Sequence, residues 1–295
     1  MQQEQGITRR SWLKGSAAAA GVLLARRAAG FVDQPPAVKT VVIDCHAHFH
    51  NPARADYQER DRLLIEAADK LGIDQLCCST LTPKRPATVD GFRECNRSLA
   101  EAIGRFPGRV LGYCYVNPGY TREAVDEVRR YVEDHGFIGV KLYNEHVCTD
   151  PVVAPVVELT IELRVPILHH AGHAHYPLPG QPNISDGGHL AELGRRYPEA
   201  QLICAHVGGG GDWEWTIKAL RHAENVCLDT SGSVTDEGMI EMAADALGAD
   251  RLLFGCDMSM TAGVGKIRAA DLSTADKAKI LGGNMQRILA KRRPS

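Results

Sequence analysis

The sequence lacks an excess of charge of either sign: 34 Lys and Arg residues stand against 36 Asp and Glu residues, and the net charge is −2. A near-neutral balance gives no reason to expect nucleic acid or an acidic membrane surface as a partner. No run of aromatic or basic residues identifies a ligand. The 295 residues are 44% apolar and 24% charged, the composition of an ordinary soluble globular chain that is long enough for one large core.

A cysteine pattern typical of disulfide frameworks or of Cys-x-x-Cys motifs is also lacking. The nine cysteines are an odd number and form no Cys-x-x-Cys pair, and disulfide frameworks belong to chains with small cores. Cys148 could line a site, although an inert thiol is the better interpretation. The other cysteines in apolar, strand-like runs are expected to be small buried hydrophobes: Cys45, Cys77, Cys78, Cys114, Cys204, Cys227 and Cys256.

No apolar run approaches the ~20 residues that span a bilayer. The longest near the N-terminus, residues 15–25, is about half that length and follows Arg9-Arg10-Ser11-Trp12-Leu13-Lys14. Residues 1–30 therefore resemble a twin-arginine export signal, with Trp12 where Phe is usual. This predicts recognition by the twin-arginine export machinery, a periplasmic or extracellular location in a bacterium, and no permanent membrane span. A disordered basic tail is the alternative.

The rest of the chain, residues 38–295, is predicted to be one domain in which strand and helix patterns alternate. Strand-like runs cover residues 41–45, 73–80, 109–116, 137–143, 165–170, 201–207, 225–230 and 251–256. Helical patterns cover residues 63–71, 92–103, 125–132, 151–163, 186–197, 212–223, 235–247 and 273–290. Eight such units in roughly 250 residues fit an α/β fold of the (β/α)8 TIM-barrel type, although alternation alone also allows an open doubly wound sheet.

A His-x-His motif follows the first strand-like run, in Asp44-Cys45-His46-Ala47-His48. Alternation along a strand would place Asp44, His46 and His48 on one face. Two imidazoles side by side form half of a metal site, because neutral imidazole is the commonest nitrogen ligand for zinc and similar ions. Alone, the motif also fits two exposed histidines on an edge strand.

Other chemically active residues lie at the ends of later strand-like runs. Lys141 lies on the fourth run, His169 and His170 end the fifth, His206 lies at the end of the sixth, and Asp257 follows the eighth. In a barrel the C-terminal strand ends converge on one point, whereas an open sheet would hold its first and eighth strands far apart. This distribution favours the barrel and predicts one shared site.

Four segments together resemble the amidohydrolase superfamily. They are Asp-x-His-x-His at 44–48, Pro-Ile-Leu-His-His-Ala-Gly at 166–172, Ala-His-Val-Gly-Gly at 205–209 and Phe-Gly-Cys-Asp at 254–257. The late segment Gly282-Gly283-Asn284 is similar to the amidohydrolase-related branch, which holds metal-dependent hydrolases and non-oxidative decarboxylases. The resemblance covers the whole of residues 38–295 and keeps the order of the motifs.

The resemblance implies a role for each matched residue. His46 and His48 would bind a divalent metal, and His170 would be the fifth-strand ligand. Asp257 would be a ligand or a hydrogen-bond partner of the metal water, and also the proton shuttle. His206 would bind a second metal or polarise the substrate.

Three residues are expected to contact the substrate: Lys141, His169 and His173. In some superfamily branches the fourth-strand lysine is carboxylated and bridges two metals; here we favour a free ammonium that holds a substrate carboxylate, and one metal per chain. His169 occupies the opposite strand face from its neighbour, which also suits a packing role. His173 lies with His175 and Tyr176 on the loop after the fifth strand, where plain surface polarity is the alternative.

The implied set of three histidines and a carboxylate suits Zn²⁺, and Mn²⁺ or Fe²⁺ would also fit. Such a metal lowers the pKa of bound water to ~7 and polarises a carbonyl, while a neighbouring carboxylate carries the proton. The expected function is a metal-dependent hydrolase in which metal-activated water attacks an amide, ester or lactone of a small molecule. A non-oxidative decarboxylase on the same metal is the alternative, and a metal-binding protein without turnover is a third interpretation. Assembly into a homo-oligomer is left open.

Overall fold

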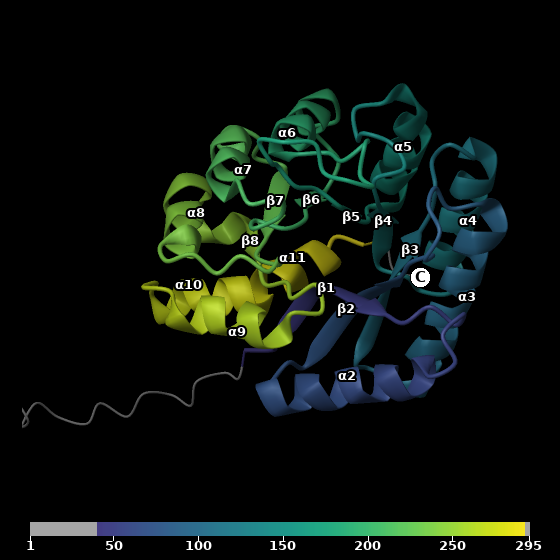
Figure 1. Cartoon of the computed structure of the whole chain (residues 1–295), viewed down its shortest axis with the longest axis horizontal. Coiled ribbons are helices and arrows are strands. Elements are labelled where there is room, and N and C mark those ends of the chain that lie inside the picture. The colour runs from purple at the N-terminus through teal and green to yellow at the C-terminus, as the bar shows by residue number, and fades with distance from the viewer. Residues whose placement is uncertain (1–39, 293–295) are drawn as a thin grey trace, which may run out of the picture. The chain divides into compact units, whose positions relative to one another are not determined.

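The computed structural model describes residues 40–292, in which parallel strands alternate with helices (Figure 1). The predicted export signal lies outside the described residues and stays a prediction. The strands are β1 (Ile43–Phe49), β2 (Gln75–Thr80), β3 (Val110–Tyr115), β4 (Gly139–Leu142), β5 (Ile167–His169), β6 (Leu202–Cys204), β7 (Val226–Asp229) and β8 (Leu252–Leu253). They follow one another around an eight-stranded sheet in sequence order.

Main-chain hydrogen bonds join the segment after β8 to β1. Cys45 N donates to Phe254 O at 2.8 Å, and Asp257 N donates to His46 O at 2.7 Å. These bonds bring the first and last strands together, as a barrel requires and an open sheet does not allow. The predicted (β/α)8 TIM barrel is confirmed.

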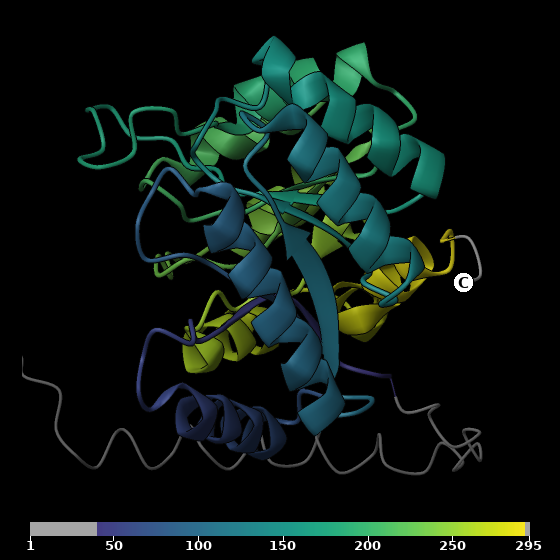
Figure 2. The same ribbon diagram turned by 90° about the vertical axis from the view of Figure 1, so that its right-hand side faces the viewer.

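Helices surround the strands (Figure 1), and the side view shows α3 and α4 covering their outer face (Figure 2). They are α2 (Tyr57–Leu71), α3 (Val89–Arg105), α4 (Thr121–Glu133), α5 (Ala154–Leu163), α6 (Gly187–Arg196), α7 (Trp213–Leu220), α8 (Met239–Leu247), α9 (Met260–Ala269), α10 (Thr274–Ala278) and α11 (Asn284–Leu289), with the short turns η1 (Pro151–Val153), η2 (Ala249–Arg251) and η3 (Lys279–Gly283). Within residues 40–292, no helix has the length and apolar character needed to cross a membrane. The sequence pattern did not predict α9.

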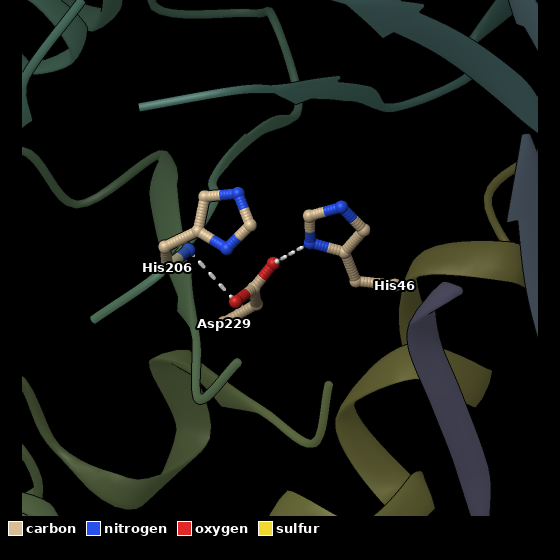
Figure 3. Close-up of side chains that lie close together, drawn as sticks. All are labelled: His46, His206 and Asp229. Atoms are coloured by element: carbon tan, nitrogen blue, oxygen red, sulfur yellow. Dashed lines mark hydrogen bonds and ion pairs between the residues drawn. The ribbon is translucent and has the colours of Figure 1, made fainter. Parts of the chain in front are cut away.

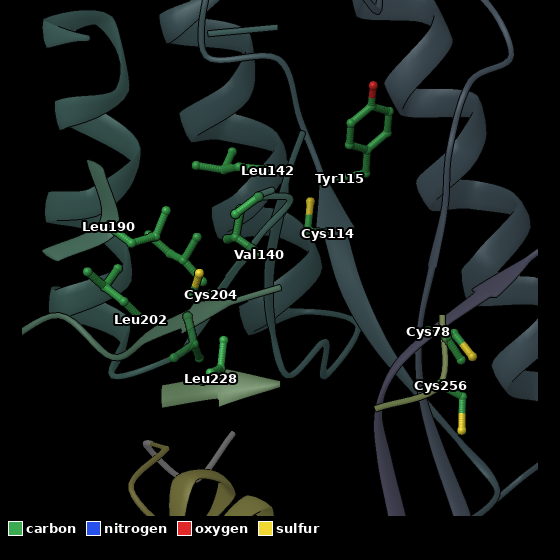
Figure 4. Packing of buried hydrophobic residues seen from close by; sticks show 14 of the residues in the cluster. Cys78, Cys114, Tyr115, Val140, Leu142, Leu190, Leu202, Cys204, Leu228 and Cys256 are labelled. Atoms are coloured by element: carbon green, nitrogen blue, oxygen red, sulfur yellow. The ribbon is translucent and has the colours of Figure 1, made fainter. Parts of the chain in front are cut away.

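Two apolar cores lie on opposite faces of the strands. The inner core lies inside the barrel and consists of Ile43, Cys45, Cys77, Tyr113, Ile138, Leu168, Ile203, Ala205 and Leu253, with Met285 and Ile288 from α11. The outer core packs the strands against the helices and includes Val140 and Leu142 of β4 (Figure 4). Because side chains alternate along a strand, Lys141 between these two residues points into the barrel.

The cysteines pack in these cores as buried residues. All nine are free thiols, and eight of them are buried. Burial raises the pKa of Cys45 and Cys204 well above the usual range of a thiol, so these groups stay protonated and inert at neutral pH. Cys148 is also buried, and its amide N donates to Ser185 Oγ at 2.9 Å.

The alternation of side chains between the two faces of the sheet is interrupted within β1. The pairing of β1 with β2 shifts register between Asp44 and Ala47, so that Cys45 packs in the inner core and Ala47 in the outer core. Asp44 does not join the two histidines that follow it. Its Oδ1 accepts hydrogen bonds from His46 N and Cys256 N, both at 3.0 Å. The predicted shared face is therefore wrong for Asp44, because the register shift changes the side-chain period.

Strands from β3 to β8 end earlier than the apolar pattern predicted, and β6 and β8 do so by three residues. The pattern extends β5, β6 and β8 to residues 170, 207 and 256, whereas strand pairing stops at residues 169, 204 and 253. Just beyond β6 and β8 the backbone enters the left-handed region at His206 (φ 64°) and Asp257 (φ 44°). Such conformations cost non-glycine residues about 1–3 kcal/mol and cluster at functional sites.

The C-terminal segment packs closely against the start of β1. A Cβ atom at Gly282 would lie 1.8 Å from Val41 O, so only glycine fits there. Asn284 Nδ2 donates to Leu252 O at 2.8 Å, and Phe254 N donates to Ile280 O at 2.9 Å. The Gly282-Gly283-Asn284 segment therefore holds β8 next to β1, which positions Asp257 near the His-x-His motif.

Candidate active site

His46 lies on β1, is fully buried, and is held in one tautomer by a carboxylate. Its Nδ1 donates to Asp229 Oδ2 at 2.8 Å, at the end of β7 (Figure 3). A carboxylate only accepts, so the proton resides on Nδ1 and Nε2 keeps a lone pair. Burial lowers the pKa of His46. The ring is therefore neutral at pH 7, which is the state that binds a metal.

Asp229 organises two histidines at once. While Oδ2 accepts from His46, Oδ1 accepts from the backbone N of His206 at 2.9 Å (Figure 3) and from both the backbone N and the hydroxyl of Ser231. Burial alone would raise the pKa of Asp229, but its electrostatic interaction and hydrogen bond with His46 hold it below its usual range. Because both carboxylate oxygens already accept hydrogen bonds, Asp229 serves as a brace rather than a metal ligand.

His48 and Asp257 complete a group of converging ligand atoms. His48 Nδ1 donates to Ser79 O at 3.2 Å, which leaves Nε2 with a lone pair. That Nε2 lies 3.2 Å from His46 Nε2 and 3.1 Å from Asp257 Oδ1. Burial would raise the pKa of Asp257, but its interactions with the imidazoles of His48, His46 and His206 hold it below the usual range. Asp257 is thus ionised at neutral pH.

Lys141 points into this group from β4. Its Nζ lies 2.9 Å from His46 Nε2, and the side chain is fully buried. Burial lowers the pKa of Lys141 to about 8, although Asp257 and Asp229 act in the opposite direction. The ammonium is therefore still largely charged at pH 7, beside imidazoles that cannot neutralise it.

His206 and His170 form the other side of the site. His206 Nδ1 donates to Ser231 Oγ at 2.9 Å, and its Nε2 lies 3.0 Å from His170 Nδ1. Burial lowers the pKa of His206 to about 4 and holds the pKa of His170 well below its usual value. The ring of His170 stacks on Tyr143 with centroids 4.0 Å apart, and its Nε2 lies 2.9 Å from Gln181 Oε1.

The donor set fits a divalent metal. Among residues 40–292, two groups of candidate ligands share His46: one adds His48 and Asp257, the other His206 and Asp229. The first group is the better site, because its imidazole Nε2 atoms and Asp257 Oδ1 converge, whereas both carboxylate oxygens of Asp229 already accept hydrogen bonds. Imidazole and carboxylate ligands together suit Zn²⁺, Mn²⁺ or Fe²⁺.

The structure brings most of the predicted site residues together, but not all of them. His46, His48, His206, Asp257 and Lys141 meet as described, and His170 reaches them through His206 rather than within a candidate ligand group.

Two predicted substrate-binding residues lie elsewhere. His169 is buried on the strand face opposite to the inner-core residue Leu168, and its Nδ1 donates to His170 O at 2.8 Å. His173 bonds to Asp186 on the loop between β5 and α6. Alternation along β5 accounts for the position of His169, which matches the packing role weighed for it.

Several residues of the site were not predicted from the sequence, among them Asp229 and Arg85. Asp229 ends the seventh strand-like run, the kind of position that marked the other candidates, and so could have been found by the same argument. Arg85 lies in the exposed β2–α3 connection, with its guanidinium 3.8 Å from the centroid of Tyr143, and its charge contributes to the lowered pKa of Lys141. No sequence signal indicated Arg85, because its contact joins two loops far apart in the chain.

Comparison with known proteins identifies the family and the fold. The amidohydrolase family matches residues 43–290. The gamma-resorcylate decarboxylase of Polaromonas sp. strain JS666 is 25% identical over 297 residues, which cover 79% of this chain and 87% of that protein.

Solved structures of such enzymes share the fold. A dihydroxybenzoic acid decarboxylase from Polaromonas sp. JS666, with bound manganese and the inhibitor 2-nitroresorcinol, has a TM-score of 0.66 and 22% identity, over 86% of this chain and 98% of that one. The 5-carboxyvanillate decarboxylase of Sphingomonas paucimobilis has a TM-score of 0.67 and 18% identity, over 85% and 99%.

Proposed function

We propose that this chain, which belongs to the amidohydrolase family, is a metal-dependent non-oxidative decarboxylase of a small hydroxyaromatic acid. The relatives named above are decarboxylases, and they align with this chain over most of their length. They support the decarboxylase alternative of the sequence analysis better than its hydrolase prediction.

One observation carries the proposal: a buried ammonium lies beside the metal-ligand group. Lys141 Nζ is 2.9 Å from His46 Nε2 in a fully buried position. A buried cation is costly unless it meets an anion. The carboxylate of an aromatic acid would supply that anion at the point where the ligand atoms converge.

A second cation lies close to Lys141. Arg85 covers the face of Tyr143 at 3.8 Å, and Tyr143 stacks on His170. Lys141 Nζ itself lies 5.9 Å from the same Tyr143 ring. We propose that Lys141 holds the substrate carboxylate and that Arg85 and Tyr143 contact the other groups of the ring, since stacked aromatic and guanidinium planes suit a flat anionic ligand.

His46, His48 and Asp257 would hold the metal, with His170 as a further proposed ligand. One ion is proposed at this catalytic centre, and Mn²⁺ joins Zn²⁺ as a candidate because manganese is bound in the Polaromonas decarboxylase structure and a carboxylate ligand suits it. When bound, a divalent metal supplies a fixed positive charge that orients anionic oxygens and stabilises negative charge developing on them.

The protein must also deliver one proton. Decarboxylation breaks the bond between the ring carbon and the carboxyl carbon, releases CO₂, and leaves an electron pair on the ring carbon that takes up a proton. Asp257 Oδ2 lies 3.5 Å from His206 Nδ1, so these two groups form an acid–base pair at the site. Asp257 is ionised in the resting site, so we propose that this carboxylate takes up the proton from solvent water and, with His206 beside it, transfers it to the ring carbon.

A substrate panel tests the proposal. The purified protein, loaded with Mn²⁺ or Zn²⁺, is incubated with 2,6-dihydroxybenzoate, with 5-carboxyvanillate and with amide, ester and lactone substrates. The expected result is release of one CO₂ per molecule of an aromatic acid consumed, and loss of this activity on chelation. Hydrolysis of an amide, ester or lactone without CO₂ release from any acid would restore the hydrolase prediction.

A further inference from the structure

A second cluster of imidazole and carboxylate groups lies outside the candidate active site. His173 and His175, on the β5–α6 connection, meet Asp212, which precedes α7. His175 Nε2 is 2.9 Å and His173 Nε2 is 3.9 Å from Asp212 Oδ2, and all three ligand atoms lie within 4.8 Å of one another. Ligands arranged tetrahedrally around Zn²⁺ lie about 3.3 Å apart, given bonds of ~2.0–2.1 Å. The observed distances bracket that value.

The cluster also has a brace of the kind found around metal-bound histidines. His173 Nδ1 donates to Asp186 Oδ2 at 3.0 Å, which places the proton on Nδ1 and leaves the lone pair on Nε2, the atom that faces Asp212. This hydrogen bond orients the ring of His173 before any ion arrives.

Backbone hydrogen bonds join the β5–α6 connection to the segment between β6 and α7. His173 N donates to Gly209 O at 3.0 Å, and Asp212 N donates to His173 O at 3.2 Å. Gly210 has φ 78°, and a Cβ atom there would lie 2.3 Å from His173 O, so glycine is required for this approach. The ring of Trp215 stacks on His173 with centroids 5.0 Å apart. The positions of His173 and Asp212 are thus preorganised, as a metal site needs.

We propose that His173, His175 and Asp212 form a second metal site that binds Zn²⁺ and joins the β5–α6 connection to the start of α7. His175 is 83% exposed and lines an open cleft with Asp212 and Trp215, so an ion can enter and a water can take the fourth position. The same connection carries Gln181, whose Oε1 lies 2.9 Å from His170 Nε2. Zinc at this loop site therefore fastens the segment that reaches the catalytic centre.

Counting zinc ions per chain tests the proposal on the whole protein. After chelation and dialysis against Zn²⁺, elemental analysis is expected to find two ions in the parent, one in H175A, and one in the double variant H46A/H48A. Combining all three substitutions is expected to leave none. Because His175 is largely exposed, H175A should fold like the parent. His222, an exposed histidine beyond α7, gives the matched control H222A, which should keep both ions.

Two further variants separate ligation from a general loss of charge. Asn can accept the same N-cap bond from Trp215 N that Asp212 accepts at 3.0 Å, so D212N keeps the helix start but is expected to weaken zinc binding in the H46A/H48A background by at least tenfold. D186N should weaken it ~10- to 100-fold through the lost brace. If H46A/H48A binds no zinc, or if H175A in that background binds zinc as tightly as H222A, the loop site does not exist. These results do not depend on the reaction that the catalytic centre performs.

Discussion

The two His–Asp clusters use the same local device in different surroundings. In each, one imidazole donates through Nδ1 to a carboxylate, His46 to Asp229 and His173 to Asp186, and Nε2 keeps its lone pair. In the active site, His46 is fully buried and its neighbours lie at the ends of barrel strands. In the loop cluster, His175 is almost fully exposed and its partners lie on connections.

This difference separates catalysis from simple binding. Burial lowers the pKa values of His46, His206 and Lys141. Fixed charges in such a place act strongly on a substrate, because little water screens them. The loop cluster lacks this environment, so it can hold an ion but offers no buried acid–base pair. The predictions below test this contrast, from the largest expected effect to the smallest.

Replacing His46 and His48 with Ala should have the largest effect. Both lone pairs that converge with Asp257 are removed, so metal content at the catalytic centre should fall from about one ion to none and turnover should become undetectable. Elemental analysis in Mn²⁺ and a turnover assay give the measurement, with H222A as control. Full metal occupancy of the double variant would refute the ligand assignment.

Asp257→Asn should lower turnover by ~10²-fold or more, the scale of lost general acid–base catalysis. The amide keeps the shape of the carboxylate but cannot carry the proton, and some metal should remain on the histidines. Asp245→Asn, on the exposed surface of α8, is the matched control. Turnover, metal content and thermal unfolding are measured on one sample. A variant that binds metal, melts like the parent and still turns over at a near-parental rate would show that Asp257 is not the proton shuttle.

Asp229→Asn should weaken metal binding ~10- to 100-fold, the usual cost of losing a carboxylate that orients a ligating histidine. The substitution removes the charge that fixes the His46 tautomer while keeping a side chain of the same size. Competition against a fluorescent chelator measures the affinity, again beside Asp245→Asn. An unchanged affinity would mean that the Asp229–His46 bond does not brace the metal site.

His189→Gln should change stability by less than about 1 kcal/mol, because the imidazole is 41% exposed and water screens the pair. The bond with Asp186 raises the pKa of His189, so its contribution is complete below ~6.5 and is lost as pH rises through the folded value. The pKa of Asp186 is lowered, so its contribution exists above ~3.9 and is lost as pH falls. Urea unfolding should therefore show the largest loss between about pH 4 and 6.5 and a smaller loss at pH 8.5. A loss of unfolding free energy that is larger at pH 8.5 than between about pH 4 and 6.5 would contradict this prediction.

Much of the barrel was predictable from three features: the strand periodicity, the helix periodicity, and the convergence of the C-terminal strand ends on one point. Strand and helix patterns alternate along the chain, and candidate ligands at the ends of distant strands indicate closure. Their positions at strand ends predicted that His46, His48 and Asp257 share one site. The register shift after Asp44 and the left-handed turns at His206 and Asp257 were not, since they depend on packing between strands that no local pattern encodes.

The bracing and the loop contacts were harder to predict for a physical reason. Asp229 supports His46 across 183 positions of sequence, and an aspartate at a strand end can equally cap a turn. His173 was expected near the substrate, but its hydrogen bond to Asp186 and its stacking on Trp215 fix it in the loop cluster. The conformation of a loop determines which residues its side chains contact, and the sequence of a loop has no periodic pattern from which that conformation could be predicted.

The most direct test of the account follows the proton in the proposed decarboxylation. The metal-loaded enzyme is run in D₂O with the aromatic acid that it consumes, and product and gas are analysed by mass spectrometry. The account predicts one CO₂ per product and one deuterium on the ring carbon that lost the carboxyl group, with both lost in Asp257→Asn. A product that keeps its carboxyl carbon and has gained the atoms of water would contradict it.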